Sequence, residues 1–118
     1  MKDLAPDITR QRLLIEGLYT STITEAVVEK YLLSIAAHLD LRFYGKPIIH
    51  SPEGIGKEDN EGFDAFLPLI DSGISLYIWS SKKFFAVVLF TCKEFDAAAA
   101  VKYTSEFFDA TEIESRGF

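Results

Sequence analysis

The stretch from Phe63 to Thr91 constrains the fold most, because it holds three runs of β-prone residues separated only by short polar connections. The runs are Phe63 to Ile70, Ile74 to Trp79 and Phe84 to Thr91, joined by Asp71-Ser72-Gly73 and by Ser80-Ser81-Lys82-Lys83. Such short connections leave no space for a crossover, so neighbouring strands are expected to pair antiparallel. The third run is apolar almost throughout, which is typical of a strand buried on both faces or nearly so.

Capping signals place two helices on either side of this β-rich region. Thr22-Ile23-Thr24-Glu25 has the form of a capping box, and Asp96 is expected to cap a second helix. The remaining expected elements are a strand from Arg10 to Tyr19, a helix over about 23 to 39, a strand from Pro47 to His50, a helix ending at Phe107 and a strand from Ala110 to Glu114. This order, β-α-β-β-β-β-α-β, predicts an α+β fold with helices on one face of an antiparallel sheet. The other face then needs a cover, and with 14% aromatic residues a homo-oligomer is expected.

Length and composition exclude several classes of protein. A chain of 118 residues suits one domain, which we expect over 10–118 after a flexible polar N-terminus at 1–9. The net charge of −6, without a run of Lys or Arg, argues against nucleic acid as a partner. No apolar run is long enough to cross a membrane, and the start MKDLAPDITRQR has no apolar signal segment, so we expect a cytoplasmic protein.

The residues most often used in chemistry give weak signals when taken alone. Cys92 is the one cysteine and the two histidines, His38 and His50, lack ligand spacing, so no metal site is expected. Gly54-Ile55-Gly56-Lys57 lacks the spacing of a phosphate-binding loop, and acidic residues follow its lysine. Trp79 is expected in the core. Composition and spacing alone therefore predict an α+β domain but indicate no function.

One segment of the sequence gives a more specific signal than composition and spacing do. Residues 71–92, DSGISLYIWSSKKFFAVVLFTC, resemble the central block of the bacterial S-adenosylmethionine decarboxylase family, E-S-H-[IL]-[ST]-I-H-T-W-P-E-x-G-Y-A-A-[VI]-D-x-F-T-C, without a gap. Weaker similarity covers Leu13-Leu14-Ile15-Glu16 and Ser51-Pro52-Glu53-Gly54, after which about nine residues are inserted. The resemblance implies a two-layer α/β sandwich, with two helices on one face of the sheet, that assembles as a dimer.

The resemblance also implies a chemistry. In this family a serine attacks the carbonyl before it, and the resulting ester is eliminated to cut the chain and leave a pyruvoyl group. That carbonyl condenses with the substrate amine and is the electron sink for decarboxylation, in the synthesis of polyamines. Carried over by position, Asp71-Ser72 is the scissile bond, Ser72 the pyruvoyl precursor, and Cys92 the group that protonates the product. Glu16 matches an acidic active-site residue.

The departures from the family pattern fall on functional positions. Tyr77 stands where the family has the histidine that drives ester elimination, and a phenol is a poor base at neutral pH. Gly73 replaces the histidine after the serine, and Ser81 replaces the glutamate that holds the ribose hydroxyls of the substrate. Tyr77 or His50 is a candidate replacement base, but the sequence does not place His50 in space.

These departures leave three interpretations open. The first is a poorly processed or unprocessed homologue that binds an S-adenosyl compound or an amino acid, or regulates a partner decarboxylase. The second is an active pyruvoyl-dependent decarboxylase of S-adenosylmethionine or of a basic amino acid such as ornithine or arginine. The third is an enzyme that cleaves S-adenosylmethionine without a pyruvoyl group, with Glu16, Tyr77 or Asp64 as acid or base. Trp79, Ser81, Asp64 and His50 are the candidates for contacting a ligand.

Overall fold

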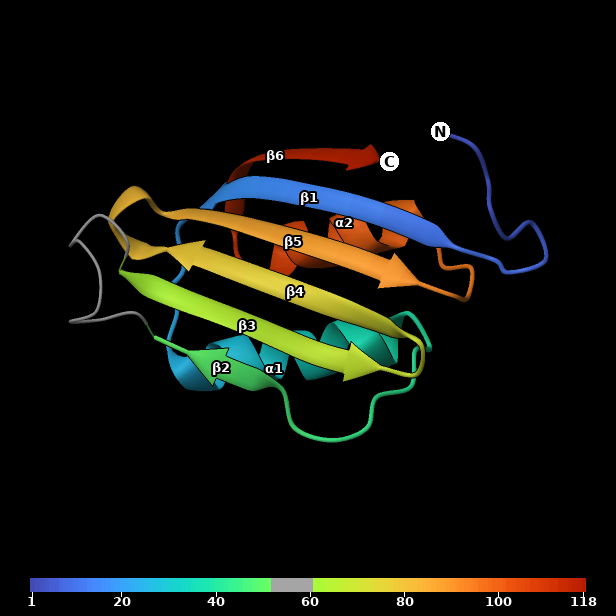
Figure 1. Cartoon of the computed structure of the whole chain (residues 1–118). Helices are drawn as coiled ribbons and strands as arrows, with labels where there is room; N and C mark the ends of the chain where they lie inside the picture. The colour runs from blue at the N-terminus through green and yellow to red at the C-terminus, as the bar shows by residue number, and fades with distance from the viewer. Residues whose placement is uncertain (52–60) are drawn as a thin grey trace.

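The structure, a computed structural model, describes residues 1–51 and 61–118. In these residues six strands form one antiparallel sheet in the order β2-β3-β4-β5-β1-β6, and two α-helices lie against one of its faces (Figure 1). The strands are β1 (Gln11–Tyr19), β2 (Ile48–His50), β3 (Gly62–Leu69), β4 (Ser72–Trp79), β5 (Phe84–Thr91) and β6 (Ala110–Gly117); the helices are α1 (Glu25–His38), α2 (Ala97–Phe107) and the 3₁₀ turn η2 (Ser80–Lys82). The expected α+β architecture and its order of elements are confirmed.

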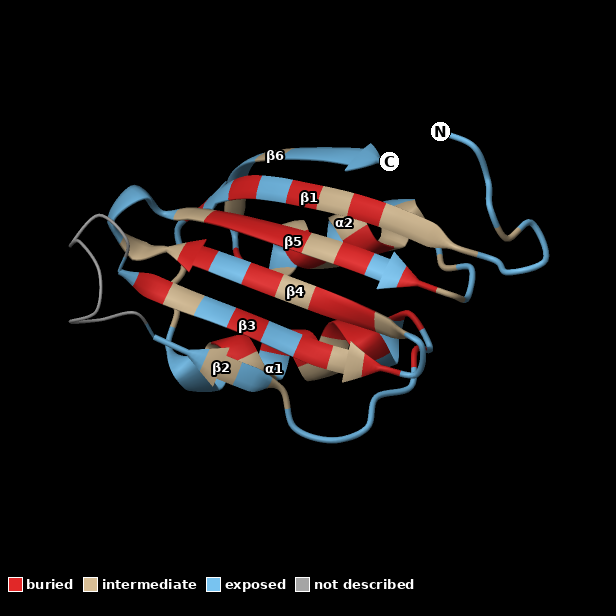
Figure 2. Cartoon of the chain, in the orientation of Figure 1, coloured by how far each residue is buried: buried red, intermediate tan, exposed pale blue. Residues whose placement is uncertain are grey.

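The core lies between the helices and the sheet. Alternate side chains of the strands point toward the helices and are fully buried, among them Ile15, Leu76 and Val87. Figure 2 shows this alternation as red bands along the central strands. On the helix side, α1 contributes Val28, Tyr31, Leu32 and Ile35, whose spacing of three and four residues puts them on one face of the helix. Burial of this single apolar layer fixes which face of every strand is left outside.

The opposite face of the sheet has no cover in the described residues. Leu18, Phe66, Tyr77 and Phe90 point to this side and are between 37% and 40% exposed. The prediction that Phe84 to Thr91 is buried on both faces or nearly so is confirmed for most of the strand, since Ala86 is buried and Phe84 and Val88 are half-buried on the outer side, and only Phe90 is exposed. Trp79 also lies on this outer face, where its ring is 5.2 Å from the ring of Phe84, so its placement in the core is corrected.

Two local predictions differ in detail from the structure. The N-cap of α1 is Thr24 rather than Thr22, because the Thr24 hydroxyl accepts a hydrogen bond from the backbone N–H of Val27. The turn between β3 and β4 is Ile70–Asp71 rather than 71–73, since Ser72 already pairs with Leu69 in the ladder. Asp96 caps α2 as expected, by accepting from the N–H of Ala99. The Gly54-Ile55-Gly56-Lys57 segment lies outside the described residues.

A buried hydrogen bond joins the two helices. The Tyr31 hydroxyl lies 2.7 Å from the Thr104 hydroxyl, and both residues are fully buried. Burial raises the pKa of the Tyr31 phenol well above its usual range, and the hydrogen bond to Thr104 offsets only part of that increase. The folded state therefore binds the phenolic proton more tightly than the unfolded chain does.

This linkage predicts a loss of stability in alkali. Above about pH 10 the unfolded chain releases the Tyr31 proton while the folded chain keeps it, so the free energy of unfolding falls by up to about 1.4 kcal/mol per pH unit. We expect Tyr31→Phe to remove this part of the slope in urea denaturations between about pH 8 and about pH 11. Tyr44→Phe, at a side chain that is 71% exposed, is the matched control. An unchanged slope in Tyr31→Phe would contradict the assignment.

Gly17 is expected to be intolerant of any side chain. A Cβ at this position would lie 2.6 Å from the Phe85 ring and 2.8 Å from the backbone oxygen of Glu112, which is fixed in β6. Gly17→Ala should therefore lower the free energy of unfolding by about 1 to 3 kcal/mol in a denaturant titration. Gly45→Ala is the control, since a Cβ there would have no neighbour within 4 Å. Equal stability of the two variants would show that β1 and β6 separate easily.

Candidate active site

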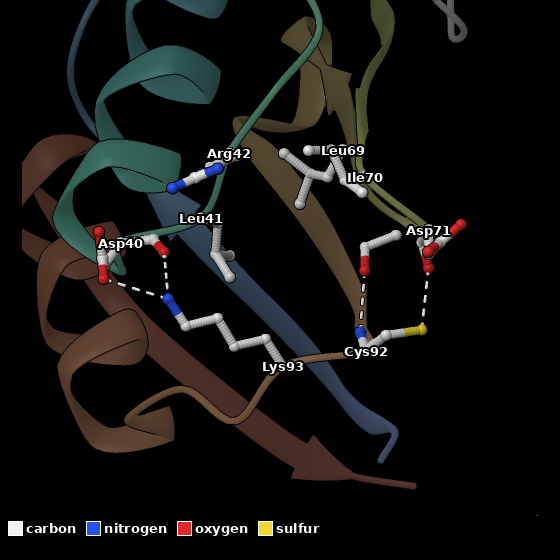
Figure 3. Close-up of a pocket in the computed structure, with 9 residues that line it drawn as sticks. Asp40, Leu41, Arg42, Leu69, Ile70, Asp71, Cys92 and Lys93 are labelled. Carbon is white, nitrogen blue, oxygen red and sulfur yellow. Dashed lines mark hydrogen bonds and ion pairs between the residues drawn. The ribbon is translucent and has the colours of Figure 1, made fainter. Parts of the chain in front are cut away.

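The strand pairing brings Ser72 and Cys92 together at one end of the sheet. Ser72 is the first residue of β4, and Cys92 directly follows β5, its antiparallel neighbour. The backbone N–H of Cys92 donates a hydrogen bond of 2.8 Å to Ser72 Oγ, and the Cys92 thiol donates to the backbone oxygen of Asp71 at 3.0 Å (Figure 3). Both contacts therefore bear on the peptide bond between Asp71 and Ser72.

Polar side chains fix the segment that carries Cys92. The Thr91 hydroxyl is fully buried and donates to the backbone oxygen of Lys93 at 2.8 Å. The side-chain amide of Gln11 then pairs with both backbone groups of Phe95, donating to its oxygen and accepting from its N–H, each at 3.0 Å. The turn after β5 is thus held to β1 at two points, which orients the thiol toward Asp71.

Ser72 and Cys92 line a cavity of about 390 Å³. Its wall is completed by the segment after α1, where the backbone oxygen of Arg42 accepts from the N–H of Ile70 at 3.4 Å. Lys93 closes another side, because its ammonium donates to the backbone oxygen of Asp40 at 2.8 Å and to its carboxylate at 3.1 Å. The residues that line the cavity are Asp40, Leu41, Arg42, Leu69, Ile70, Asp71, Ser72, Cys92 and Lys93.

The backbone is strained at the residue before Ser72. Asp71 has a φ of 55°, in the left-handed region that costs most residues about 1 to 2 kcal/mol. Aspartate and asparagine enter this region more readily than other non-glycine residues, because their short polar side chains hydrogen-bond locally. The local geometry thus accounts for aspartate, rather than a longer acid, at this position.

The arrangement suits attack of a serine on its own preceding carbonyl. In such an attack negative charge develops on the Asp71 oxygen, and a donor already pointed at that oxygen stabilises it. The Cys92 thiol is such a donor, although a weak one. Among the described residues, however, no histidine lines the cavity, and no side chain accepts a hydrogen bond from the Ser72 hydroxyl.

Comparison with known proteins gives the family of the chain. The profile of the S-adenosylmethionine decarboxylase family matches residues 19–118. The chain belongs to this family. The crystal structure of the adenosylmethionine decarboxylase from Aquifex aeolicus VF5 is similar in fold, with a TM-score of 0.76 and 13% sequence identity over 94% of this chain and 89% of that chain. A search of curated proteins finds no match.

S-adenosylmethionine decarboxylases are pyruvoyl-dependent, and the residues around Ser72 fit a precursor of that group. Ser72 supplies the hydroxyl, Asp71 the carbonyl and Cys92 the donor, all within one cavity. No group of three or more His, Cys, Asp or Glu residues that could hold a metal ion occurs in residues 1–51 and 61–118. Neither helix in this part of the chain has the length and apolar character of a membrane span.

The other residues expected in the site lie elsewhere on the molecule. Tyr77 follows Ser72 by five positions on β4, about 17 Å along the strand. Its side chain points to the open face of the sheet, since its neighbours Leu76 and Ile78 point to the core. The open face also carries Asp64, His50, Glu16 and Trp79, while Ser81 lies in the η2 turn. A single chain therefore brings Ser72 and Cys92 together but leaves the remaining candidates outside their cavity.

Two features of the site have no clear signal in the sequence. Asp40 and Lys93 are 53 positions apart in the sequence, and their ion pair depends on the turn after α1 reaching the end of β5. Gly73 is the second feature, because a Cβ there would lie 2.4 Å from the ring of Phe66 on the neighbouring strand. Phe66 thus occupies the space in which the family's histidine after the serine would begin.

This contact predicts an energetic coupling between the two positions. Gly73→Ala should lower the free energy of unfolding by about 1 kcal/mol, because the added methyl group displaces the Phe66 ring. In a Phe66→Ala background the same substitution should have little effect, which a double-mutant cycle in urea would measure. Equal costs in the two backgrounds would mean that the ring moves aside freely.

Proposed function

We propose that the chain is a self-cleaving, pyruvoyl-dependent decarboxylase that acts on a small amino compound. The observation that carries this proposal is the set of contacts at one peptide bond: Cys92 Sγ on the Asp71 oxygen and Cys92 N–H on Ser72 Oγ. Together they hold the nucleophile and polarise the carbonyl that it would attack. The pyruvoyl group, once formed at position 72, would accept the substrate amine and take up the electrons released with carbon dioxide.

The proposed roles of the chain's own residues follow from their places. Ser72 is the nucleophile, Asp71 supplies the leaving carboxylate, and Cys92 first stabilises the oxyanion and later returns a proton to the product. Ser81 lacks the carboxylate with which the family holds ribose, which favours a substrate other than S-adenosylmethionine. The carboxylates of Glu16 and Asp64 on the open face favour a basic amino acid such as ornithine or arginine.

We further propose a homodimer in which two open sheet faces pack together. The apolar side chains on this face, between 37% and 40% exposed in a single chain, would then be buried. A two-fold axis between the sheets and perpendicular to the strands reverses strand direction, so the start of β4 in one copy faces the end of β4 in the other. Such packing would bring open-face residues of the second copy to the end of the sheet at which Ser72 lies. A cytoplasmic location remains a prediction.

A second candidate function is an uncut homologue that binds a ligand or regulates a partner decarboxylase. The absence of a histidine from the described lining of the cavity favours this alternative, because ester elimination needs a base. In this case Ser72 would be an ordinary residue at the start of a strand, and Ser72→Ala would leave ligand binding unchanged.

One measurement separates the two candidates. After prolonged incubation of freshly purified protein, a self-cleaving chain should give fragments of residues 1–71 and 72–118 in an intact mass spectrum under denaturing conditions, with a pyruvoyl group on the second. Ser72→Ala should abolish both fragments, whereas Ser75→Ala, at a half-buried serine on the same strand, should not. A single full-length species in the wild type would support the uncut homologue. Cleaved protein would then be assayed for carbon dioxide release from S-adenosylmethionine, ornithine and arginine.

A further inference from the structure

The last strand of the chain leaves one edge of the sheet unpaired. β6 pairs with β1 on one side, and no other strand in residues 1–51 and 61–118 lies beside it (Figure 1). It is eight residues long and exposed over most of its length (Figure 2). The strand at the opposite edge, β2, has only three residues. A long free edge of this kind presents backbone donors and acceptors that can pair with another strand.

The pairing with β1 determines which backbone groups of β6 point outward. The N–H of Phe118 donates to the backbone oxygen of Arg12 at 3.4 Å, so these two residues form a hydrogen-bonded pair. In an antiparallel ladder such pairs alternate with pairs that are not hydrogen-bonded. The register of β1 and β6 then directs the N–H and carbonyl groups of Ile113, Ser115 and Gly117 away from β1. These three residues supply the groups that a further strand would bind.

Charged side chains of both signs line the open-face side of this edge. Glu112, Glu114 and Arg116 alternate along β6 with residues that point to the helix side. Glu114 lies directly opposite Glu16 of β1, and like charges in this arrangement destabilise a strand pair. Among the described residues neither of these two carboxylates is in an ion pair. A cation brought to the edge by another strand would therefore be favourable next to Glu114.

From this register and charge pattern we propose that β6 pairs antiparallel with β6 of a second copy, with the two-fold axis at Ser115. Ser115 then exchanges backbone hydrogen bonds with Ser115 of the second copy, and Ile113 exchanges them with Gly117. On the open face Glu114 of each copy lies opposite Arg116 of the other, so an ion pair forms on either side of the axis. The two sheets join into one continuous antiparallel sheet.

Charge favours this register over the neighbouring ones. A two-fold axis at Glu114 or at Arg116 would set two identical charges directly against each other. The axis at Ser115 instead opposes residues of opposite charge, and it leaves Glu112 opposite the uncharged side chain of Phe118. The sequence of β6 is therefore complementary to itself when it is read in the reverse direction about Ser115.

An apolar groove on the helix side adjoins the same edge. It has a volume of about 550 Å³ and lies between α2 and β6, where Val101 of the helix and Ile113 of the strand are among its lining residues. Ser115 also lines the groove, because it alternates with the charged residues of the open face. Pairing about Ser115 would bring the grooves of two copies side by side and remove apolar surface from water.

The edge contact does not depend on the proposed function or on the face-to-face dimer. It uses backbone groups at the edge of the sheet, whereas cleavage involves Ser72 and the face-to-face dimer buries apolar side chains of the open face. A chain that uses both contacts would form a tetramer, and a chain that uses only the edge would form a dimer. In either case a change at β6 should halve the mass of the assembly.

The first test reverses one charge at a time and measures the mass by sedimentation velocity over a range of concentrations. Glu114→Arg and Arg116→Glu each replace attraction by repulsion on both sides of the axis, so each should raise the dissociation constant of the edge contact at least about 10-fold. An equimolar mixture of the two variants should restore association, because every charge at these positions then opposes one of the other sign. Glu112→Arg is the matched control, since it changes the net charge equally but has no charged partner across the edge.

The outcomes of this test are distinct. Restoration in the mixture can come only from folded chains, so it also excludes misfolding as the cause of the loss in the single variants. A monomeric wild type would overturn the proposal, and so would an equal mass for Glu114→Arg and Glu112→Arg. Single variants that stay dissociated when mixed would show that the two charges do not face each other.

The second test maps the register. In the proposed pairing the Cα atoms of the two copies of Ser115 are about 5.5 Å apart, which is within reach of a disulfide. Ser115→Cys should therefore give a covalent dimer with oxidised glutathione, and peptide mass spectrometry should find position 115 bonded to itself. Thr111→Cys is the control, because this residue is exposed on the same strand but its two copies would lie about 27 Å apart along the strands. Equal cross-linking of the two variants, or bonding through Cys92 alone, would contradict the axis at Ser115.

Discussion

The structure depends on the burial of one face of a six-stranded antiparallel sheet under two helices. This single apolar layer decides which side chains of each strand point inward, and by alternation which point outward. Because the helices cover only one side, the outer side keeps a surface of leucine, phenylalanine and tyrosine that a second layer would bury. The candidate functional residues are divided between the cavity at Ser72 and this open face.

The two groups of candidate residues are held in place by different interactions. Ser72 and Cys92 sit at a strand end, where the β4–β5 pairing and the Gln11 clamp on the following turn hold them in contact. Tyr77, Asp64 and His50 lie at one level of three adjacent strands on the open face, an alignment that cross-strand register determines. A substitution in one group is therefore expected to leave the geometry of the other intact.

The fold was largely predictable because local signals agreed with the tertiary structure. Short connections between apolar runs required antiparallel pairing, and Asp96 capped α2 as expected. The predictions were wrong where tertiary packing or the backbone conformation of one residue determined the local structure. The large apolar ring of Trp79 favours a place in the core. Successive side chains of a strand point to opposite faces, however, and the position of Trp79 in β4 puts it on the open face. The turn was expected at 71–73 because glycine favours turns, whereas Asp71 itself adopts the left-handed conformation.

The sequence by itself determined the family and the residues Tyr77, Gly73 and Ser81 that depart from its pattern, because these are properties of residue identity along one segment. Only the tertiary structure decided which of these residues meet. The thiol of Cys92 reaches the Asp71 oxygen because β4 and β5 are antiparallel neighbours, and His50 reaches the level of Tyr77 because β2 pairs with β3 in one register. Contacts between distant residues follow from strand order and register, which burial of the whole core fixes.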